Sequence, residues 1–346
     1  MKQTIRLLRV VGSPFISEAE LEDPPDDHEA LRLYYYAARN RMAFLYLTAL
    51  KKWRELGKLQ GIYDDMHRKV VKTDCAFSRV SRILGNAGIQ HALFKTIRPY
   101  RSTTVDIDVI IFGSDKEYQM SIGAMKTAGY KELGFGPNST TIQDPYIGIG
   151  VDLYREVAVS KIIYLDKTKL HHHVTENDEL VHSDPVATLF PSADLIALIA
   201  HSVIKEHMYT LSEYYSTLYF LDRMSSENIR DFVNMTHDNN VVTAARVHLG
   251  MTLQLHEAAY GVCPEKLSGI IDKIGIDPLE TSRVRMSHDA PYKFHILTIA
   301  KTLSEKMRKD SKARKSMARQ IVSFVDPRFM GEIVKRVLDQ ISRESY

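Results

Sequence analysis

Two carboxylates separated by a single residue stand inside an apolar stretch of the chain. Residues 105–112 read VDIDVIIF and are rich in β-branched side chains, which predicts a short, central, buried strand. Residues two apart on a strand face the same side, so Asp106 and Asp108 are expected to lie next to each other. Because two half-buried like charges are unfavourable without a cation, the pair predicts a site for a hard divalent metal, Mg²⁺ or Mn²⁺, with oxygen ligands.

A third acid lies in a second apolar segment. Asp152 belongs to the sequence IGIGVDLYREV, which also predicts a strand. If the two strands are neighbours, Asp152 lies beside the pair, and three carboxylates can hold two metal ions that bridge phosphates. The alternative is a structural pair of acids neutralised by Arg98 or Arg101.

Groups that suit phosphate precede the acidic pair. Lys95 ends the short segment HALFK, where its ammonium can meet a phosphate as a point charge. Thr96 follows it, and the connecting loop offers further hydroxyls, guanidinium groups and backbone N–H groups. A solvated turn explains this loop equally simply. The loop residues considered are Arg98, Arg101, Ser102, Thr103 and Thr104.

The order of these features resembles the nucleotidyltransferase superfamily with the DNA polymerase beta-like core. It is similar in particular to an uncharacterised nucleotidyltransferase family with lysine-glycine, arginine, DID, Gly-Tyr and DLH motifs. The resemblance covers about residues 85–225, and the stretch from Asp194 to Leu221 resembles that family's helical tail. The matching positions are Leu93-Phe94-Lys95-Thr96, Arg101, Asp106-Ile107-Asp108, Gly129-Tyr130 and Asp152-Leu153-Tyr154.

The resemblance implies an α/β core with a mixed sheet. It also implies metal-dependent transfer of a nucleoside monophosphate from an NTP to an acceptor, with Asp106, Asp108 and Asp152 as metal ligands and catalytic acids. In this scheme the nucleotide phosphates meet Lys95, Thr96, Arg101 and Ser102. One departure is plain: the family has a small residue, usually glycine, where this chain has Lys95-Thr96, so close approach of the backbone to phosphate is in question.

The elements that would position the site suggest three parts and an α+β fold class. We predict an N-terminal helical segment over 1–86, a nucleotidyltransferase-like core over 87–166, and a C-terminal helical region over 167–346. Strands are predicted only in the core, near 90–95, 105–112, 146–157 and 162–165. Helices are predicted over 30–56, 63–84, 115–128, 193–208, 211–223, 226–238, 240–259, 264–273, 291–308, 312–323 and 328–344.

Composition adds broad limits. The chain of 346 residues is 44% hydrophobic and 26% charged, with a net charge of +3, which fits a globular protein and permits an anionic partner. The longest apolar runs are shorter than a membrane span, and we expect a cytoplasmic protein. Cys75 and Cys263 lack metal-site spacing and are expected to be small buried hydrophobes in a reducing compartment.

Other signals leave several interpretations open. The basic tract 306–319 suits an RNA or nucleotide phosphate, or a solvated helix face. The histidines at 171–173, and His201 with His207, are interpreted as exposed or packing residues rather than metal ligands. No P-loop or dinucleotide-binding motif is present. Besides the transferase, we consider a catalytically inactive relative that binds nucleotide or a partner, and an all-helical binding protein.

Overall fold

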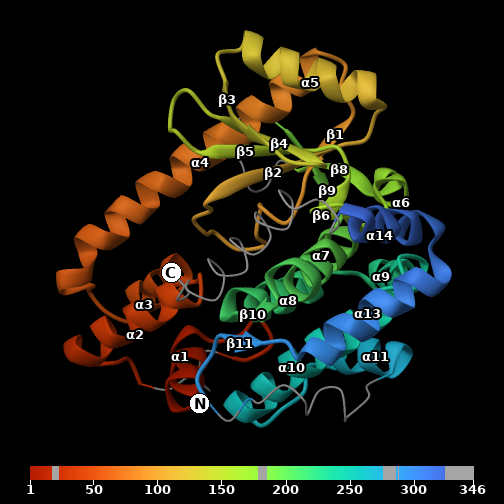
Figure 1. Cartoon of the computed structure of the whole chain (residues 1–346). Helices are drawn as coiled ribbons and strands as arrows, with labels where there is room; N and C mark the ends of the chain where they lie inside the picture. The colour runs from red at the N-terminus through yellow and green to blue at the C-terminus, as the bar shows by residue number, and fades with distance from the viewer. Residues whose placement is uncertain (18–22, 178–184, 276–285, 287, 324–346) are drawn as a thin grey trace.

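The computed structural model describes residues 1–17, 23–177, 185–275, 286 and 288–323 (Figure 1). The chain folds into a mixed sheet that is flanked by helices from both ends of the sequence, in agreement with an α+β class. The all-helical alternative is therefore wrong. The helix predicted over 328–344 lies outside the described residues.

A seven-stranded sheet carries the acidic segments. Its central strand is β2, which runs parallel to β5 and antiparallel to β1. In spatial order the strands are β3 (Lys131–Phe135), β4 (Ser139–Gln143), β5 (Gly150–Tyr154), β2 (Asp106–Ile111), β1 (His91–Leu93), β9 (Val186–Leu189) and β8 (Val174–Asn177).

The sheet is larger than the sequence pattern indicates. The pattern predicts strands only up to residue 165, yet β8 and β9 join the sheet, with β9 parallel to β1. It also misses the hairpin of β3 and β4, where exposed polar residues hide the apolar alternation typical of a half-buried strand. β6 (Val157–Val159) pairs with the predicted strand β7 (Ile162–Leu165) in a separate ladder, and β10 (Met208–Tyr209) pairs with β11 (Tyr292–Lys293).

Helices cover the two faces of the sheet unequally. On one face, α4 (Gln60–Asn86) and α5 (Asp115–Thr127) pack on the apolar side chains of β2, β4 and β5 (Figure 1). On the other face, Ile110 and Tyr154 join a large helical core that includes α7 (Pro191–Ala200). Asp106, Asp108 and Asp152 lie on this second face and precede Ile110 and Tyr154 along the same two strands.

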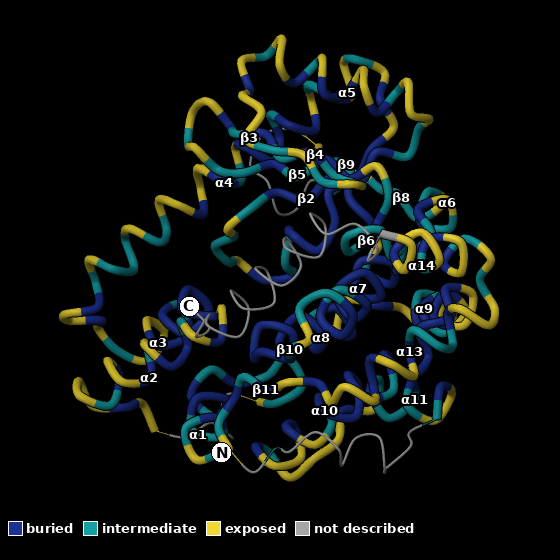
Figure 2. The backbone as a smooth tube through the Cα atoms, viewed as in Figure 1, coloured by how far each residue is buried: buried dark blue, intermediate teal, exposed yellow. Residues whose placement is uncertain are grey.

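The N-terminal region is helical, as predicted, but it contains a helix that was not predicted, α1 (Lys2–Val11), and one predicted helix is broken. The helix predicted over 30–56 is two helices, α2 (Asp27–Arg39) and α3 (Ala43–Trp53). Arg41 between them has a φ of 58, a left-handed conformation that an α-helix cannot pass through. The helix predicted over 63–84 is confirmed as α4, which η2 (Gly57–Leu59) precedes. The first half of α4 alternates between exposed and partly buried residues, as Figure 2 shows, and only Val70 of residues 60–72 is buried.

The C-terminal region is mainly helical, as predicted. The predicted helix 193–208 is shorter, because α7 ends at residue 200 and continues as a π-helix, η4 (His201–Glu206). The helix predicted over 291–308 begins only after β11. The remaining helical elements are α6 (Lys167–Leu170), η3 (His171–His173), α8 (Leu211–Arg223), α9 (Ser226–Asp238), α10 (Val242–Tyr260), α11 (Glu265–Ile274), α13 (Ile296–Lys309) and α14 (Ser311–Ser323).

Two further predictions concerned the cysteines and membrane-spanning helices. Cys75 and Cys263 are free thiols on the surface, so the prediction that they are buried is wrong. Within the described residues, no helix has the length and apolar character needed to cross a bilayer.

Candidate metal and nucleotide site

The register of the sheet brings the three predicted acids together. Asp108 of β2 lies directly opposite Asp152 of β5, and Asp106 precedes Asp108 by two residues on the same face. One carboxylate oxygen from each residue lies within 4.8 Å of the others. Among the described residues this is the one group of three or more acids, histidines or cysteines so placed, and the predicted cluster is confirmed as a geometric arrangement.

Burial and mutual repulsion set the charge state of the pair on β2. Burial, followed by the nearby charge of Asp108, raises the pKa of Asp106 to about 6. Burial alone would also raise the pKa of Asp108, but the Lys95 ammonium reverses the shift and holds that pKa below its usual range. The cluster thus concentrates more negative charge than the chain neutralises, which is the electrostatic condition for binding a cation.

Asp108 has one oxygen engaged and one free. The Lys95 ammonium lies 2.5 Å from Asp108 Oδ2, and the Thr96 hydroxyl donates a 3.3 Å hydrogen bond to the same oxygen. Thr96 Oγ1 in turn accepts from the Asp108 backbone N–H at 2.8 Å. The other oxygen, Asp108 Oδ1, is buried and has no hydrogen-bond partner among the residues that the structure describes. Since a buried carboxylate oxygen without a donor is costly, Oδ1 fits a metal ligand.

Neighbouring side chains hold Asp152 and Lys95 in position. The Thr141 hydroxyl on β4, opposite Asp152 in the ladder, donates to Asp152 Oδ1. Lys95 has a φ of 50, and its backbone N–H donates to Asp194 Oδ1 at 2.5 Å. Asp194 is buried in the first turn of α7, and burial raises its pKa to about 7. Helix α7 therefore holds the left-handed turn that aims Lys95 at Asp108.

The π-helix contributes a cation that the sequence pattern does not reveal. Lys205 Nζ donates a 3.2 Å hydrogen bond to the hydroxyl of Tyr154, two residues after Asp152. Burial lowers the pKa of Lys205, and the charges of Asp108 and Asp106 act in the opposite direction. The predicted α-helical periodicity places Lys205 on a different face, because a π-helix has a longer turn. The one feature of the sequence that could have indicated Lys205 is its position in the stretch that resembles the family's helical tail.

Two histidines in this stretch differ in their surroundings. His201 lies 3.3 Å from both the Tyr164 hydroxyl and Glu206 Oε1, and burial lowers its pKa to about 3. His207 is exposed and bonds to the backbone oxygen of Ile204. Neither belongs to a metal-type cluster within the described residues, nor do the histidines of η3.

The loop arginines do not neutralise the triad. Arg98 lies 3.1 Å from Ser216 Oγ and 3.6 Å from Glu213, both on α8. Arg101 forms a 3.3 Å ion pair with Asp74 of α4. The alternative in which one of these arginines pairs with the acids is therefore wrong, since Lys95 takes that role. Ser102 is partly exposed in the same loop, and nucleotide binding by Arg101 and Ser102 stays a prediction.

The basic tract 306–319 is partly used inside the fold. Lys306 is buried, and its ammonium donates to the backbone oxygen of Asn239 at 2.6 Å. Lys312 forms a 2.8 Å ion pair with Asp166. Arg314 and Lys315 are exposed on α14, and an RNA contact through them stays a prediction.

Comparisons with known proteins add little to this geometry. No protein-family model matches the chain, and no curated protein matches it. Among solved structures, the chain is similar to an antigenic nucleotidyltransferase-like protein from Paracoccidioides brasiliensis. The identity is 10% and the TM-score 0.30, over 52% of this chain and 93% of that one. A likeness this low establishes no shared activity, and the case for function rests on the carboxylates.

Proposed function

We propose that this protein is a divalent-metal-dependent nucleotidyltransferase that moves a nucleoside monophosphate from an NTP to a hydroxyl acceptor. The observation that carries the proposal is the meeting of Asp106, Asp108 and Asp152 on adjacent parallel strands. Within the described part of the chain, the buried Asp108 Oδ1 also has no hydrogen-bond donor. Three carboxylates at this spacing suit Mg²⁺ or Mn²⁺, which bind hard oxygen ligands. A bound metal would neutralise phosphate charge and polarise the α-phosphorus.

The chain's own groups supply the remaining requirements of the reaction. The acceptor oxygen forms a bond to the α-phosphorus, the bond from that phosphorus to the bridging oxygen breaks, and pyrophosphate leaves with the bond's electron pair. Asp152 is the proposed acceptor of the hydroxyl proton. Lys95 and Lys205 face the acidic cluster, where their charges can hold the triphosphate in line for attack. Thr96, Arg101 and Ser102 are proposed as further phosphate contacts.

One observation favours a second candidate, an inactive relative that binds nucleotide without turnover. The Lys95 backbone N–H, at the position where the family has a small residue, donates to Asp194 rather than being free for a phosphate. The Lys95 ammonium is likewise paired with Asp108. Both bonds have to be exchanged or shared when an NTP binds.

Calorimetric titration of each of the four NTPs with Mg²⁺ tests the proposal. We expect the wild type to bind at least one NTP in a metal-dependent manner and the Asp106→Ala/Asp108→Ala variant to lose this binding. Asp115→Ala removes an exposed carboxylate on α5, bonded to Arg155, and is the matched control. A folded wild type that binds no NTP would contradict the proposal. Metal-dependent binding without pyrophosphate release across a panel of acceptors would select the inactive relative.

A further inference from the structure

Glu206, the last residue of the π-helix, is held at both of its carboxylate oxygens. His201 Nε2 lies 3.3 Å from Oε1, and the Arg41 guanidinium donates a 3.4 Å hydrogen bond to Oε2. The contact with His201 holds the pKa of Glu206 well below its usual range, so the carboxylate is ionised. Glu206 directly follows Lys205, and these contacts therefore act on the residue next to the cation that faces the acids.

His201 is itself held by a buried hydroxyl group. The Tyr164 hydroxyl on β7 lies 3.3 Å from His201 Nδ1, and Tyr164 is fully buried. Burial keeps the His201 ring neutral by lowering its pKa to about 3. Since a carboxylate can only accept, the ring carries its hydrogen on Nε2, toward Glu206, and accepts from Tyr164 at Nδ1. Glu206 is thus connected through His201 to the ladder of β6 and β7.

The spacing of His201 and Glu206 suits a π-helix and not an α-helix. The two residues are the first and last of η4, and a π-helix closes its turn between residues i and i+5. In an α-helix, with about 3.6 residues per turn, residues five apart lie about 140° from each other around the axis. The contact between them therefore favours the π-turn, in which Lys205 Nζ reaches the Tyr154 hydroxyl at 3.2 Å.

The second contact of Glu206 comes from the N-terminal helical region. Arg41 lies between α2 and α3, directly after Asn40, which is fully buried. Asn40 accepts two hydrogen bonds from the start of α8: its backbone oxygen accepts from Ser212 N–H at 3.1 Å, and its Oδ1 accepts from Leu211 N–H at 3.3 Å. The turn is therefore docked on the segment that follows the π-helix, with Arg41 against Glu206.

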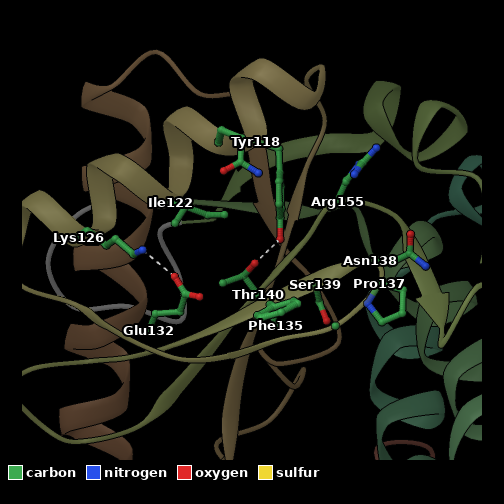
Figure 3. Close-up of a pocket in the computed structure, with 12 residues that line it drawn as sticks. Tyr118, Ile122, Lys126, Glu132, Phe135, Pro137, Asn138, Ser139, Thr140 and Arg155 are labelled. Carbon is green, nitrogen blue, oxygen red and sulfur yellow. Dashed lines mark hydrogen bonds and ion pairs between the residues drawn. The ribbon is translucent and has the colours of Figure 1, made fainter. Parts of the chain in front are cut away.

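The cavity on the opposite face of the sheet contains two comparable ion pairs. Figure 3 shows this cavity of about 280 Å³ between α5 and the hairpin of β3 and β4. Lys126 is paired with Glu132 at 2.6 Å, and Arg155 is paired with Asp115 at 2.7 Å. The two pairs are at least partly exposed, as the pair on Glu206 is, but strand alternation directs the cavity away from the acidic cluster. They therefore serve as controls for an ion pair without a link to Lys205.

We propose that Glu206 is a positioning residue that orients Lys205 for NTP binding, and that the N-terminal helical region takes part in the site through Arg41. Neither Glu206 nor Arg41 contacts the nucleotide in this arrangement, since both act through the last turn of the π-helix. The inference rests on the proposed nucleotidyl transfer and adds the residues that set the orientation of its second lysine.

Positioning and direct electrostatics predict opposite signs for a substitution at Glu206. A carboxylate near a triphosphate repels it, so Glu206→Gln should bind NTP more tightly if its charge alone matters. If Glu206 holds Lys205 in place, the same substitution should weaken NTP binding, because the ammonium no longer meets the phosphates in the required geometry. The sign of the change therefore distinguishes the two roles.

Calorimetric titration of NTP with Mg²⁺ into single variants measures this sign. Glu206→Gln should bind NTP about fivefold more weakly than the wild type. Arg41→Ala should lose about threefold, the size expected of an exposed ion pair, and Arg41→Lys should recover most of that loss. Glu132→Gln and Arg155→Ala are the matched controls at the cavity and should bind as the wild type does.

The Lys205→Gln background shows whether these residues act through Lys205. In that background Glu206→Gln and Arg41→Ala should cause no further loss of NTP affinity. In the wild-type background, Arg41→Ala combined with Glu206→Gln should bind NTP as Glu206→Gln alone does, because Arg41 acts on Glu206. Urea unfolding confirms that each variant is folded, and the exposed Arg41 gives a variant with little effect on stability.

Two results overturn the inference while leaving the proposed function intact. One is a Glu206→Gln protein that binds NTP as tightly as the wild type or more tightly. The other is an equal loss of affinity in the presence and absence of Lys205, which would mean that Arg41 or Glu206 acts independently of that lysine. A folded wild type that binds no NTP would instead refute the proposed function, and the inference with it.

Discussion

The helical core around α8 and α10 and the acidic cluster on β2 and β5 both bury polar side chains, but the two regions satisfy these side chains differently. In the helical core, neutral groups pair with each other: Thr217 lies 2.9 Å from His248, and Tyr209 lies 2.7 Å from Thr252. In the acidic cluster, like charges are held together, and no donor from the described ranges reaches Asp108 Oδ1.

The cost of an unpaired group differs between these regions. The helical core also contains neutral atoms that no described residue pairs with, such as His248 Nδ1 and the Tyr214 hydroxyl, at a cost of about 1–3 kcal/mol each. An unpaired buried carboxylate costs more. The polar groups of the helical core therefore serve packing, whereas the acids of the sheet retain binding capacity for a cation from outside the chain.

The largest expected effect comes from removing Lys95, the cation that pairs with Asp108. Lys95→Met leaves Asp108 buried without its ion-pair partner, which should lower the free energy of unfolding by about 3–5 kcal/mol in the absence of metal. Mg²⁺ should restore part of this loss, because a bound metal replaces the missing charge. Urea unfolding with and without Mg²⁺ measures both effects.

Lys131→Met, which removes an exposed lysine from the same sheet, is the control for this variant. A Lys95→Met protein that is as stable as the control, or that gains no more from Mg²⁺ than the wild type does, would show that Asp108 tolerates burial without a partner.

A second substitution tests whether the π-helix takes part in NTP binding. Lys205→Gln removes an ammonium that faces Asp106 and Asp108, so NTP affinity should fall by about tenfold. Divalent-metal affinity should stay the same or rise, because a competing positive charge is gone. Calorimetric titrations of Mg²⁺ alone and of Mg²⁺ with NTP separate these readouts, with Lys116→Gln as the matched exposed lysine. A parallel fall in both affinities would point to a structural role instead.

A third prediction concerns the stability of the helical core at acid pH. Burial lowers the pKa of His248 from 6.5 to about 3, so the unfolded chain takes up a proton at a pH where the folded chain does not. His248 therefore contributes full stability above pH 6.5 and loses about 1.4 kcal/mol per pH unit below it, until pH 3 is reached.

Replacing His248 tests this pH dependence. His248→Phe should flatten the fall of stability between pH 6.5 and 4.5, and Thr217 keeps its bond to the Glu213 backbone oxygen in that variant. Urea midpoints over this pH range, with the exposed His237→Phe as control, give the slope. An unchanged slope would mean that other groups dominate acid unfolding.

The acidic site could be predicted because its determinants are local. Asp106 and Asp108 share a face by strand alternation alone, and the apolar residues around them indicate a central strand. Asp152 needed one assumption, that its strand is the neighbour of β2, and the parallel register confirms it. The phosphate roles assigned to Arg101 and Ser102 depended on loop geometry, which sequence spacing does not determine.

The sequence by itself determined the carboxylate cluster, the α+β class and most of the helices, because strand and helix periodicity are short-range properties. Only the tertiary structure decided the rest. It broke the predicted 30–56 helix at Arg41, added β8 and β9 to the sheet, and turned Lys205 toward the acids through a π-helix. These outcomes depend on contacts between residues distant in sequence, whose energies outweigh local preference.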